Sequence, residues 1–307
     1  MYGEHVLSER WGGVVLHYGC CLRIALAGKG KARLKQLLGA GAMMEMDSLD
    51  KARSRLEWYA IRLNDSISRR FPLRPFCLPK NERIITFTFD DVPDTAESAG
   101  AAILDKHGVH GTFYIAGNLV GTKEAKRNLI TQEGCRKLVE RGHELGCHTY
   151  DHLKVPYVGA QNIVADLDRN TAYLDVFEPD RVEARNFAYP YCASSMMSRR
   201  LFADRFSTCR GGGNRINRGM IDLAFLQAVE IRQPDDDAAR QTRWIDDLNA
   251  NPGWLVFYTH DVSDTPTEFG CKPETFERLV SHAVKSGAAV LSVREALARL
   301  GAQRGAA

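Results

Sequence analysis

The chain has 307 residues, of which 44% are hydrophobic and 26% are charged, with a formal net charge of +3. This composition is that of a globular protein, and the length allows one large α/β barrel or two ordinary domains. No stretch approaches the ~20 apolar residues of a membrane span, so the sequence predicts no transmembrane segment.

The positive charge is concentrated near the N-terminus. Residues 1–80 contain 14 Lys and Arg against 7 Asp and Glu, a net charge of +7, whereas the remainder carries −4. Such a segment can touch an acidic membrane surface or nucleic acid, but a solvated helical face is the commoner explanation. We expect no nucleic-acid partner, and peripheral membrane contact stays open.

The cysteine pattern and the N-terminal sequence bear on location. The eight cysteines form no Cys-x-x-Cys pair and no spacing typical of small disulfide-rich domains, which favours free thiols in a reducing compartment. The segment GGVVLHYGCCLRIALAG, residues 12–28, is the nearest approach to a signal sequence. His17 and Arg23 interrupt it, and no basic segment precedes it. We therefore expect a cytoplasmic protein.

Residues 1–80 are predicted to form an extension of the main domain. Residues 1–46 show no firm pattern and end in the Met-rich MMEM, so translation from one of these methionines is a hypothesis that an intact-mass measurement would test. Residues 48–63 place apolar side chains on one helical face. Residues 71–80, FPLRPFCLPK, contain three prolines and are predicted to be a linker.

From residue 83 the chain alternates between strand and helix patterns. We predict strands at 84–89, 112–116, 144–147, 187–189, 206–209, 229–231, 254–259 and 289–291. We predict helices at 96–106, 132–141, 161–177, 195–204, 235–249, 273–286 and 293–300. This alternation predicts an irregular (β/α) barrel of about seven to eight parallel strands at residues 81–300, with 301–307 as a tail.

Polar clusters follow four of the predicted strands. Asp90 and Asp91 end the first, HTYDH (148–152) follows the third, YPYC (189–192) follows the fourth, and His260 ends WLVFYT. Active sites of such barrels lie at the C-terminal ends of the strands. We therefore expect these clusters to meet at one rim.

Two histidines in HTYDH suggest a metal site. His148 and His152 are four residues apart, so on a helical turn they would face the same way and share one ion. Two imidazoles and one carboxylate leave a coordination position open, as catalytic zinc sites do. Adjacent carboxylates at the end of a buried strand are tolerable beside a cation, so we expect a divalent metal, with zinc as the first candidate.

These segments resemble the successive motifs of the NodB-homology polysaccharide deacetylases, carbohydrate esterase family 4. The resemblance rests on TFDD, HTYDH, FAYPY and VFYTH, and it covers residues 83–300. It implies the following roles: Asp90 as general base, Asp91, His148 and His152 as metal ligands, His260 as general acid, and the backbone N–H of Tyr191 as part of the oxyanion site.

The sequence departs from the family pattern in the supporting residues. The arginine that orients the base stands three residues before the tyrosine in the family, where this chain has Ala188. Arg185 is the nearest candidate, with a surface arginine as the alternative. The family's Asp-x-x-Asp-Trp segment is not evident. Asp235 and Asp236 are candidates in its place, with a solvated helix start as the alternative.

Other features have plainer explanations. Val92 and Cys192 stand where the family has glycine, and RGGGN (210–214) is predicted to be a barrel loop. Three aromatic residues are candidates to stack against sugars, with core packing as the alternative: Trp244, Trp254 and Tyr150.

The resemblance implies a hydrolase that removes N-acetyl groups from an amino-sugar oligosaccharide or polysaccharide. With a cytoplasmic location, an oligosaccharide or a carrier-linked glycan is expected as substrate. An O-acetyl esterase or an N-deformylase acting on a glycan would use the same machinery. A sugar-binding barrel without turnover is the third alternative.

Overall fold

The structure is a computed structural model that describes residues 70–232 and 238–305, with six single positions between 56 and 67. Trp58–Ala307 form one compact unit. The predictions for residues 1–46 and most of the predicted helix 48–63 fall outside the described residues, although positions 56, 59, 60 and 63 are helical. Within the described ranges, no helix is long and apolar enough to cross a membrane.

Seven parallel strands close a barrel, and an eighth lies beside it. In barrel order the seven are β2 (Arg83–Asp90), β3 (Thr112–Ile115), β4 (Glu144–Cys147), β5 (Phe187–Ala188), β6 (Cys209–Gly213), β8 (Leu226–Glu230) and β9 (Gly253–Thr259). β9 pairs back with β2 over nearly its whole length, which closes the ring. β10 (Ala289–Val290) pairs with the start of β2, whereas β3 pairs with its end. The predicted irregular (β/α) barrel is confirmed.

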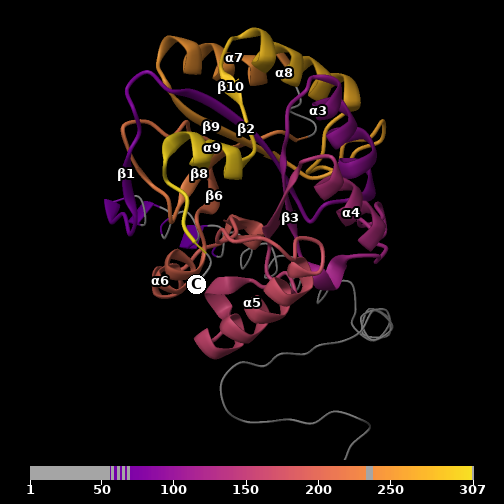
Figure 1. Cartoon of the computed structure of the whole chain (residues 1–307), viewed down its shortest axis with the longest axis vertical. Coiled ribbons are helices and arrows are strands. Elements are labelled where there is room, and N and C mark those ends of the chain that lie inside the picture. The colour runs from indigo at the N-terminus through magenta and orange to yellow at the C-terminus, as the bar shows by residue number, and fades with distance from the viewer. Residues whose placement is uncertain are drawn as a thin grey trace, which may run out of the picture. The chain divides into compact units, whose positions relative to one another are not determined.

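Helices surround the strands, as Figure 1 shows for α3, α4, α5, α7 and α8. The α-helices are α3 (Ala102–Lys106), α4 (Gln132–Glu140), α5 (Ala160–Asp175), α6 (Met196–Arg205), α7 (Ala238–Ala250), α8 (Pro273–Lys285) and α9 (Val293–Leu300). Short helical turns are η1 (Ala96–Ala101), η2 (Gly117–Leu119), η3 (Val155–Tyr157) and η4 (Pro190–Cys192). Several of the predicted helices begin at a residue whose side chain caps the helix. Thr131 accepts from Gly134 N at 3.1 Å, and Ser292 forms a capping box with Glu295.

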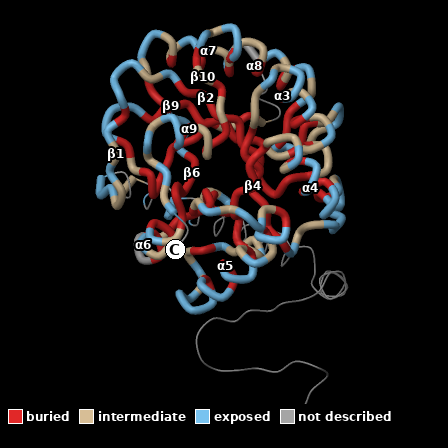
Figure 2. The backbone as a smooth tube through the Cα atoms, viewed as in Figure 1, coloured by how far each residue is buried: buried red, intermediate tan, exposed pale blue. Residues whose placement is uncertain are grey.

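The alternation of side chains along β2 fixes what faces the barrel interior. Phe87 and Phe89 belong to the large core between strands and helices, together with α8 residues such as Phe276. The alternate residue Thr86 accepts a hydrogen bond from Trp254 Nε1 at 2.9 Å inside the barrel. Asp90 shares this second face because side chains alternate with period two. Figure 2 shows the buried strands at the centre and exposed residues on the outer helices.

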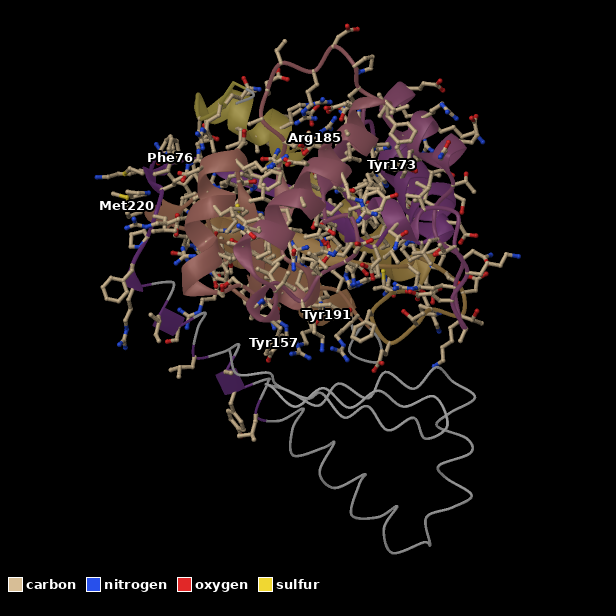
Figure 3. The ribbon with its side chains drawn as sticks, turned by 90° about the horizontal axis from the view of Figure 1, so that it is seen from below. Phe76, Tyr157, Tyr173, Arg185, Tyr191 and Met220 are labelled. Atoms are coloured by element: carbon tan, nitrogen blue, oxygen red, sulfur yellow. The ribbon has the colours of Figure 1, made fainter. Side chains whose placement is uncertain are left out.

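The predicted linker at 71–80 contains a strand, which corrects that prediction. β1 (Pro75–Cys77) pairs antiparallel with β7 (Met220–Asp222), and Figure 3 shows Phe76 and Met220 together. The Asp222 carboxylate accepts the N–H groups of Leu73 and Arg74 at 3.1 and 2.9 Å. Local sequence signals do not show this pairing because its partner lies about 145 residues away, so the prolines alone suggest a linker.

Six cysteines fall within the described ranges, and all six are free: Cys77, Cys135, Cys147, Cys192, Cys209 and Cys271. This agrees with the prediction of free thiols for that part of the chain.

Candidate metal centre

β2 carries two carboxylates to the C-terminal rim of the barrel. Asp90 is the last residue of the strand and is 4% exposed, and Asp91 follows it and is 7% exposed. Asp91 has φ +56°, in the left-handed region that non-glycine residues rarely adopt. The backbone turn therefore points two successive acidic side chains to the same buried place, at a cost in strain.

The HTYDH segment after β4 is an irregular loop and not the helical turn that the sequence analysis expected. Thr149 and His152 have φ values of +60° and +50°, which break any helix. Asp166 of α5 fixes the loop by accepting the backbone N–H groups of Tyr150 and Asp151 at 2.6 and 2.9 Å. The two imidazoles converge through this loop geometry instead of helical spacing.

Asp91, His148 and His152 meet at one point. His152 Nε2 lies 2.9 Å and His148 Nε2 3.5 Å from Asp91 Oδ1. One ligand atom from each residue lies within 4.8 Å of the other two, so together they could hold a metal ion. Asp91 Oδ1 is buried, yet it makes no hydrogen bond within the described part of the chain. An orphaned carboxylate oxygen between two imidazoles is what a cation site requires.

The protonation of these groups suits a cation. His148 Nδ1 lies 2.8 Å from the Ala188 carbonyl oxygen; as that oxygen only accepts, Nδ1 carries the proton and Nε2 offers a lone pair. Burial lowers the pKa of His148 to about 4, so its imidazole is neutral near pH 7. Burial raises the pKa of Asp91, but the imidazoles of His152, His148 and His260 outweigh it and hold this pKa well below the usual value.

Asp90 is paired with an arginine that the sequence analysis did not select. Arg210, in β6, is fully buried, and its Nη2 donates to Asp90 Oδ1. Its guanidinium also lies over the rings of Tyr114 and Tyr258, at 5.4 and 4.7 Å from their centroids. Arg210 therefore holds the carboxylate, the role that the resemblance implied for an arginine where this chain has Ala188. The first four residues of RGGGN, 210–213, belong to β6, which corrects the predicted loop.

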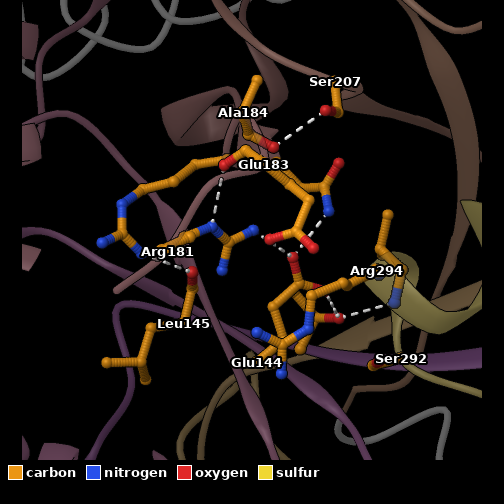
Figure 4. A network of polar contacts seen from close by, with 12 residues as sticks. Glu144, Leu145, Arg181, Glu183, Ala184, Ser207, Ser292 and Arg294 are labelled. Atoms are coloured by element: carbon orange, nitrogen blue, oxygen red, sulfur yellow. Dashed lines mark hydrogen bonds and ion pairs between the residues drawn. The ribbon is translucent and has the colours of Figure 1, made fainter. Parts of the chain in front are cut away.

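Arg185 does not support Asp90, and this candidate was wrong. Its Nη2 lies 2.7 Å from Asp175, and its Nη1 contacts Glu178 and the Leu145 carbonyl oxygen. Figure 3 shows Arg185 well separated from Tyr191. Figure 4 shows the neighbouring network of Glu144, Arg181 and Arg294. Arg185 is nearly buried, so the surface alternative fails as well, and the arginine belongs to a structural ion-pair network.

His260 reaches the site from the end of β9. Its Nε2 lies 3.9 Å from Asp91 Oδ2, and its Nδ1 lies 3.2 Å from the Phe269 carbonyl oxygen. Asp235 and Asp236, predicted to support this histidine, lie outside the described residues. Its role as an acid stays a prediction.

Backbone strain concentrates around the site. Seven non-glycine residues in the described ranges have positive φ, and six of them lie in the segments that form the site: Asp91, Val92, Thr149, His152, Tyr191 and Cys192. Val92 and Cys192 are the positions where the family has glycine. Strain of this kind persists where the surrounding structure enforces it, and it gathers at functional sites.

Arg127 is a second residue that the sequence analysis missed. It lies in the loop after β3, and its Nη2 donates to Asp91 Oδ2 at 2.8 Å while its Nε donates to Glu124 at 2.7 Å. Asp91 Oδ1 thus faces the imidazoles, and Oδ2 faces a guanidinium. The loop TKEAKRN carries no motif, so no sequence signal pointed to Arg127.

The three aromatic candidates for sugar stacking are explained by packing. Trp254 is fully buried, Trp244 packs partly buried against the core, and Tyr150 lies under the Arg169 guanidinium at 4.1 Å.

Comparisons with known proteins relate part of the chain to polysaccharide deacetylases. Residues 78–204 match the family model of polysaccharide deacetylase. The chain is 32% identical over 130 residues to a bifunctional xylanase/deacetylase of Pseudobutyrivibrio xylanivorans, covering 38% of this chain and 20% of that protein. It is 23% identical over 187 residues to a chitin deacetylase of Colletotrichum lindemuthianum, covering 59% and 68%. The chain thus spans between a fifth and about two thirds of these relatives.

Solved structures show the same fold. The T48 deacetylase with substrate has a TM-score of 0.50 at 16% identity, covering 71% of this chain and 92% of that one. A CE4 family pseudoenzyme from Bacillus anthracis has a TM-score of 0.50 at 17% identity, covering 73% and 69%. At these identities the likeness concerns the fold alone. Residues 78–204, which begin the irregular barrel, therefore belong to the polysaccharide deacetylase family, carbohydrate esterase family 4.

Proposed function

We propose that this protein is a metal-dependent hydrolase that removes N-acetyl groups from an amino sugar within an oligosaccharide or polysaccharide of the chitin type. One observation carries the proposal: Asp91, His148 and His152 converge beside a second aspartate that an arginine holds in place. A cluster with no catalytic task would not need the second, separately held carboxylate.

Asp91, His148 and His152 would hold the cation, for which we propose zinc. When bound, such an ion supplies a Lewis acid that polarises the acyl carbonyl and activates water. The orphaned Asp91 oxygen and the neutral His148 imidazole fit this role.

Asp90 is proposed as the general base. Arg210 holds Oδ1, so Oδ2 is assigned to accept the proton of the attacking water. A carboxylate held on one side keeps a fixed direction toward the reacting carbon, which lowers the cost of orienting it.

His260 is proposed as the general acid that gives a proton to the departing amine. An amine leaves an acyl carbon only when its nitrogen is protonated, so this step is required for an amide. The Nδ1 contact to the Phe269 carbonyl leaves Nε2 directed toward the site. The backbone N–H of Tyr191 is proposed to stabilise the negative oxygen that forms on the acyl carbon.

The test combines metal analysis with mass spectrometry of N- and O-acylated oligosaccharides. The wild type should bind metal and release acetate from chitin oligomers. Asp90→Asn should bind metal and lose turnover. Asp94→Asn is the control and should keep activity, because Asp94 lies near the site in the sequence but its carboxylate contacts Asn128. Full activity in Asp90→Asn would rule out its role as the base.

The alternatives give different results in the same screen. Release of acetate from esters, or of formate from amides, would indicate the O-acetyl esterase or the N-deformylase. Metal binding without turnover of any acylated sugar would indicate a sugar-binding barrel. A cytoplasmic oligosaccharide or carrier-linked substrate stays a proposal.

A further inference from the structure

The two oxygens of the Asp91 carboxylate have different neighbours. Oδ1 faces the imidazoles of His148 and His152 and makes no hydrogen bond within the described part of the chain. Oδ2 accepts a hydrogen bond from Arg127 Nη2 at 2.8 Å, and His260 Nε2 lies 3.9 Å from the same oxygen. The side of the carboxylate that is left for a cation is therefore the Oδ1 side.

The loop that carries Arg127 is bonded to the segment that follows β2. The backbone N–H of Ile130 donates to the Val92 carbonyl oxygen at 2.9 Å. The backbone N–H of Asp94 donates to the Asn128 carbonyl oxygen at 3.0 Å. These bonds lie on both strands of the contact between the two segments. The guanidinium therefore reaches the carboxylate from a backbone that is anchored beside it.

The other hydrogen bonds of Arg127 do not explain its position. The side chain is 13% exposed, and its Nε donates to Glu124 at 2.7 Å. Its Nη1 is buried and finds no hydrogen-bond partner among the described residues. A buried donor without a partner costs free energy that another contact must offset. The ion pair with the buried Asp91 carboxylate is that contact, which points to a task at the carboxylate.

A carboxylate can bind a cation through one oxygen or through both. Binding through both oxygens of Asp91 would bring the cation next to the guanidinium on Oδ2, where the two positive charges repel each other. Binding through Oδ1 alone keeps the cation between the imidazoles of His148 and His152. The distribution of charge therefore favours a ligand set of one oxygen and two nitrogens, which leaves a coordination position open, as catalytic zinc sites do.

Divalent ions differ in what they gain from a second carboxylate oxygen. Zinc prefers four ligands and binds imidazole nitrogen well. Mn²⁺ prefers oxygen ligands and takes more of them. A centre in which the carboxylate offers one oxygen therefore suits zinc better than Mn²⁺.

We propose that Arg127 is a positioning residue that restricts Asp91 to one ligand oxygen, and that it thereby makes the centre select zinc over ions that prefer several oxygen ligands, such as Mn²⁺. This inference rests on the cation of the proposed function and not on the reaction. Without the guanidinium, Oδ2 becomes a second anionic ligand in the same site. It then competes for the coordination position that would otherwise stay open.

The test compares the dissociation constants of Zn²⁺ and Mn²⁺ for the full chain, measured by competition with a chelator. Arg127→Met removes the guanidinium and keeps an unbranched side chain. Loss of one positive charge should strengthen the binding of both ions alike, so the ratio of the two constants isolates the effect on the ligand set. The Kd for Mn²⁺ divided by the Kd for Zn²⁺ should fall about tenfold in the variant.

Glu124→Gln is the matched control. It removes the other ion-pair partner of Arg127 and leaves the bond to Asp91 in place. It should change both affinities together and leave their ratio unchanged. Arg127→Ala also removes the guanidinium and should lower the ratio as well, so the test does not depend on the folding of one variant.

A merely structural role of Arg127 would weaken the binding of both ions together and leave the ratio of their dissociation constants as it is in the wild type. An unchanged ratio in Arg127→Met and Arg127→Ala would therefore overturn the inference. An equal fall of the ratio in Glu124→Gln would overturn it as well, because Asp91 keeps its guanidinium there.

The two proposals fail in different ways. Acetate release by the wild type, with the same ratio of dissociation constants in the wild type and the Arg127 variants, would leave the proposed function standing and remove the selection by Arg127. A lowered ratio in these variants, with no acyl release by the wild type, would keep the inference and remove the proposed reaction.

Discussion

Replacing Arg210 by methionine tests how the base is held. Arg210 is fully buried and pairs with Asp90, which is itself 4% exposed. Methionine keeps an unbranched apolar chain but leaves a buried carboxylate without its cation. Removing one partner of a buried pair costs about 3–5 kcal/mol, a large share of the ~5–15 kcal/mol that stabilises a typical domain. Turnover should fall as well, because Asp90 loses its fixed direction.

The double variant Asp90→Asn/Arg210→Met separates the pair from simple packing. Neither side chain carries a charge in it, so it should be more stable than Arg210→Met alone by at least about 1 kcal/mol. Urea unfolding at constant m value compares the wild type, Arg210→Met and the double variant. The reasoning is refuted if Arg210→Met lowers the free energy of unfolding by less than about 1 kcal/mol. It is also refuted if adding Asp90→Asn to Arg210→Met lowers the free energy of unfolding further.

Arg185→Met is the matched control. This arginine is also nearly buried and paired, with Asp175 and Glu178, but it lies away from the site. Its replacement should reduce stability and leave kcat/KM unchanged in the fraction that stays folded. A loss of kcat/KM equal to that of Arg210→Met would contradict the assignment of Arg210.

Three further predictions concern pH, strain and the N-terminal strand. Burial lowers the pKa of His148 from 6.5 to about 4, so in this window the unfolded chain binds a proton that the folded chain does not. The metal-free protein should therefore lose up to about 3 kcal/mol between pH 6.5 and 4, and urea unfolding of His148→Gln should lack this loss. Val92 has φ +53°, a conformation that glycine adopts more readily than alanine, so Val92→Gly should be more stable than Val92→Ala by about 1 kcal/mol. In regular structure glycine is instead the less stable of the two. Thermal unfolding of both variants tests this prediction. The free energy of unfolding of a chain that starts at residue 70 should be at least about 2 kcal/mol larger than that of a chain that starts at residue 81. The shorter chain loses β1 and the hydrogen bonds to the Asp222 carboxylate. Equal free energies of unfolding would support the prediction that residues 71–80 are a linker.

Most of the barrel could be predicted because its strands and helices have local signals. β4 was predicted at its observed bounds, and β2 and β9 to within a residue at each end, since strands buried on both faces are apolar runs. The strand predicted at 206–209 lies too early in the chain for β6, because the glycines of β6 suggested a loop. Gly211 instead allows close packing, as a Cβ there would lie 2.6 Å from the Phe225 ring.

The site was only partly predictable. Asp91, His148 and His152 lie in short motifs whose residue types suggest a metal, and the structure brings them together. Arg210 was missed because its pairing with Asp90 joins positions 120 residues apart and depends on how the barrel closes. Arg127 reaches Asp91 from a loop whose path no local pattern predicts. Tertiary contacts of this kind leave no periodic trace in a single sequence.

Metal binding by the ligand variants tests the central claim most directly. The wild type should bind about one divalent ion per chain in equilibrium dialysis, and Asp90→Asn should bind it as well. Asp91→Asn, His148→Gln and His152→Gln should each lose most of that affinity, because each removes one of the three converging ligand atoms. Undiminished binding of the ion by a chain that carries all three substitutions would contradict the account.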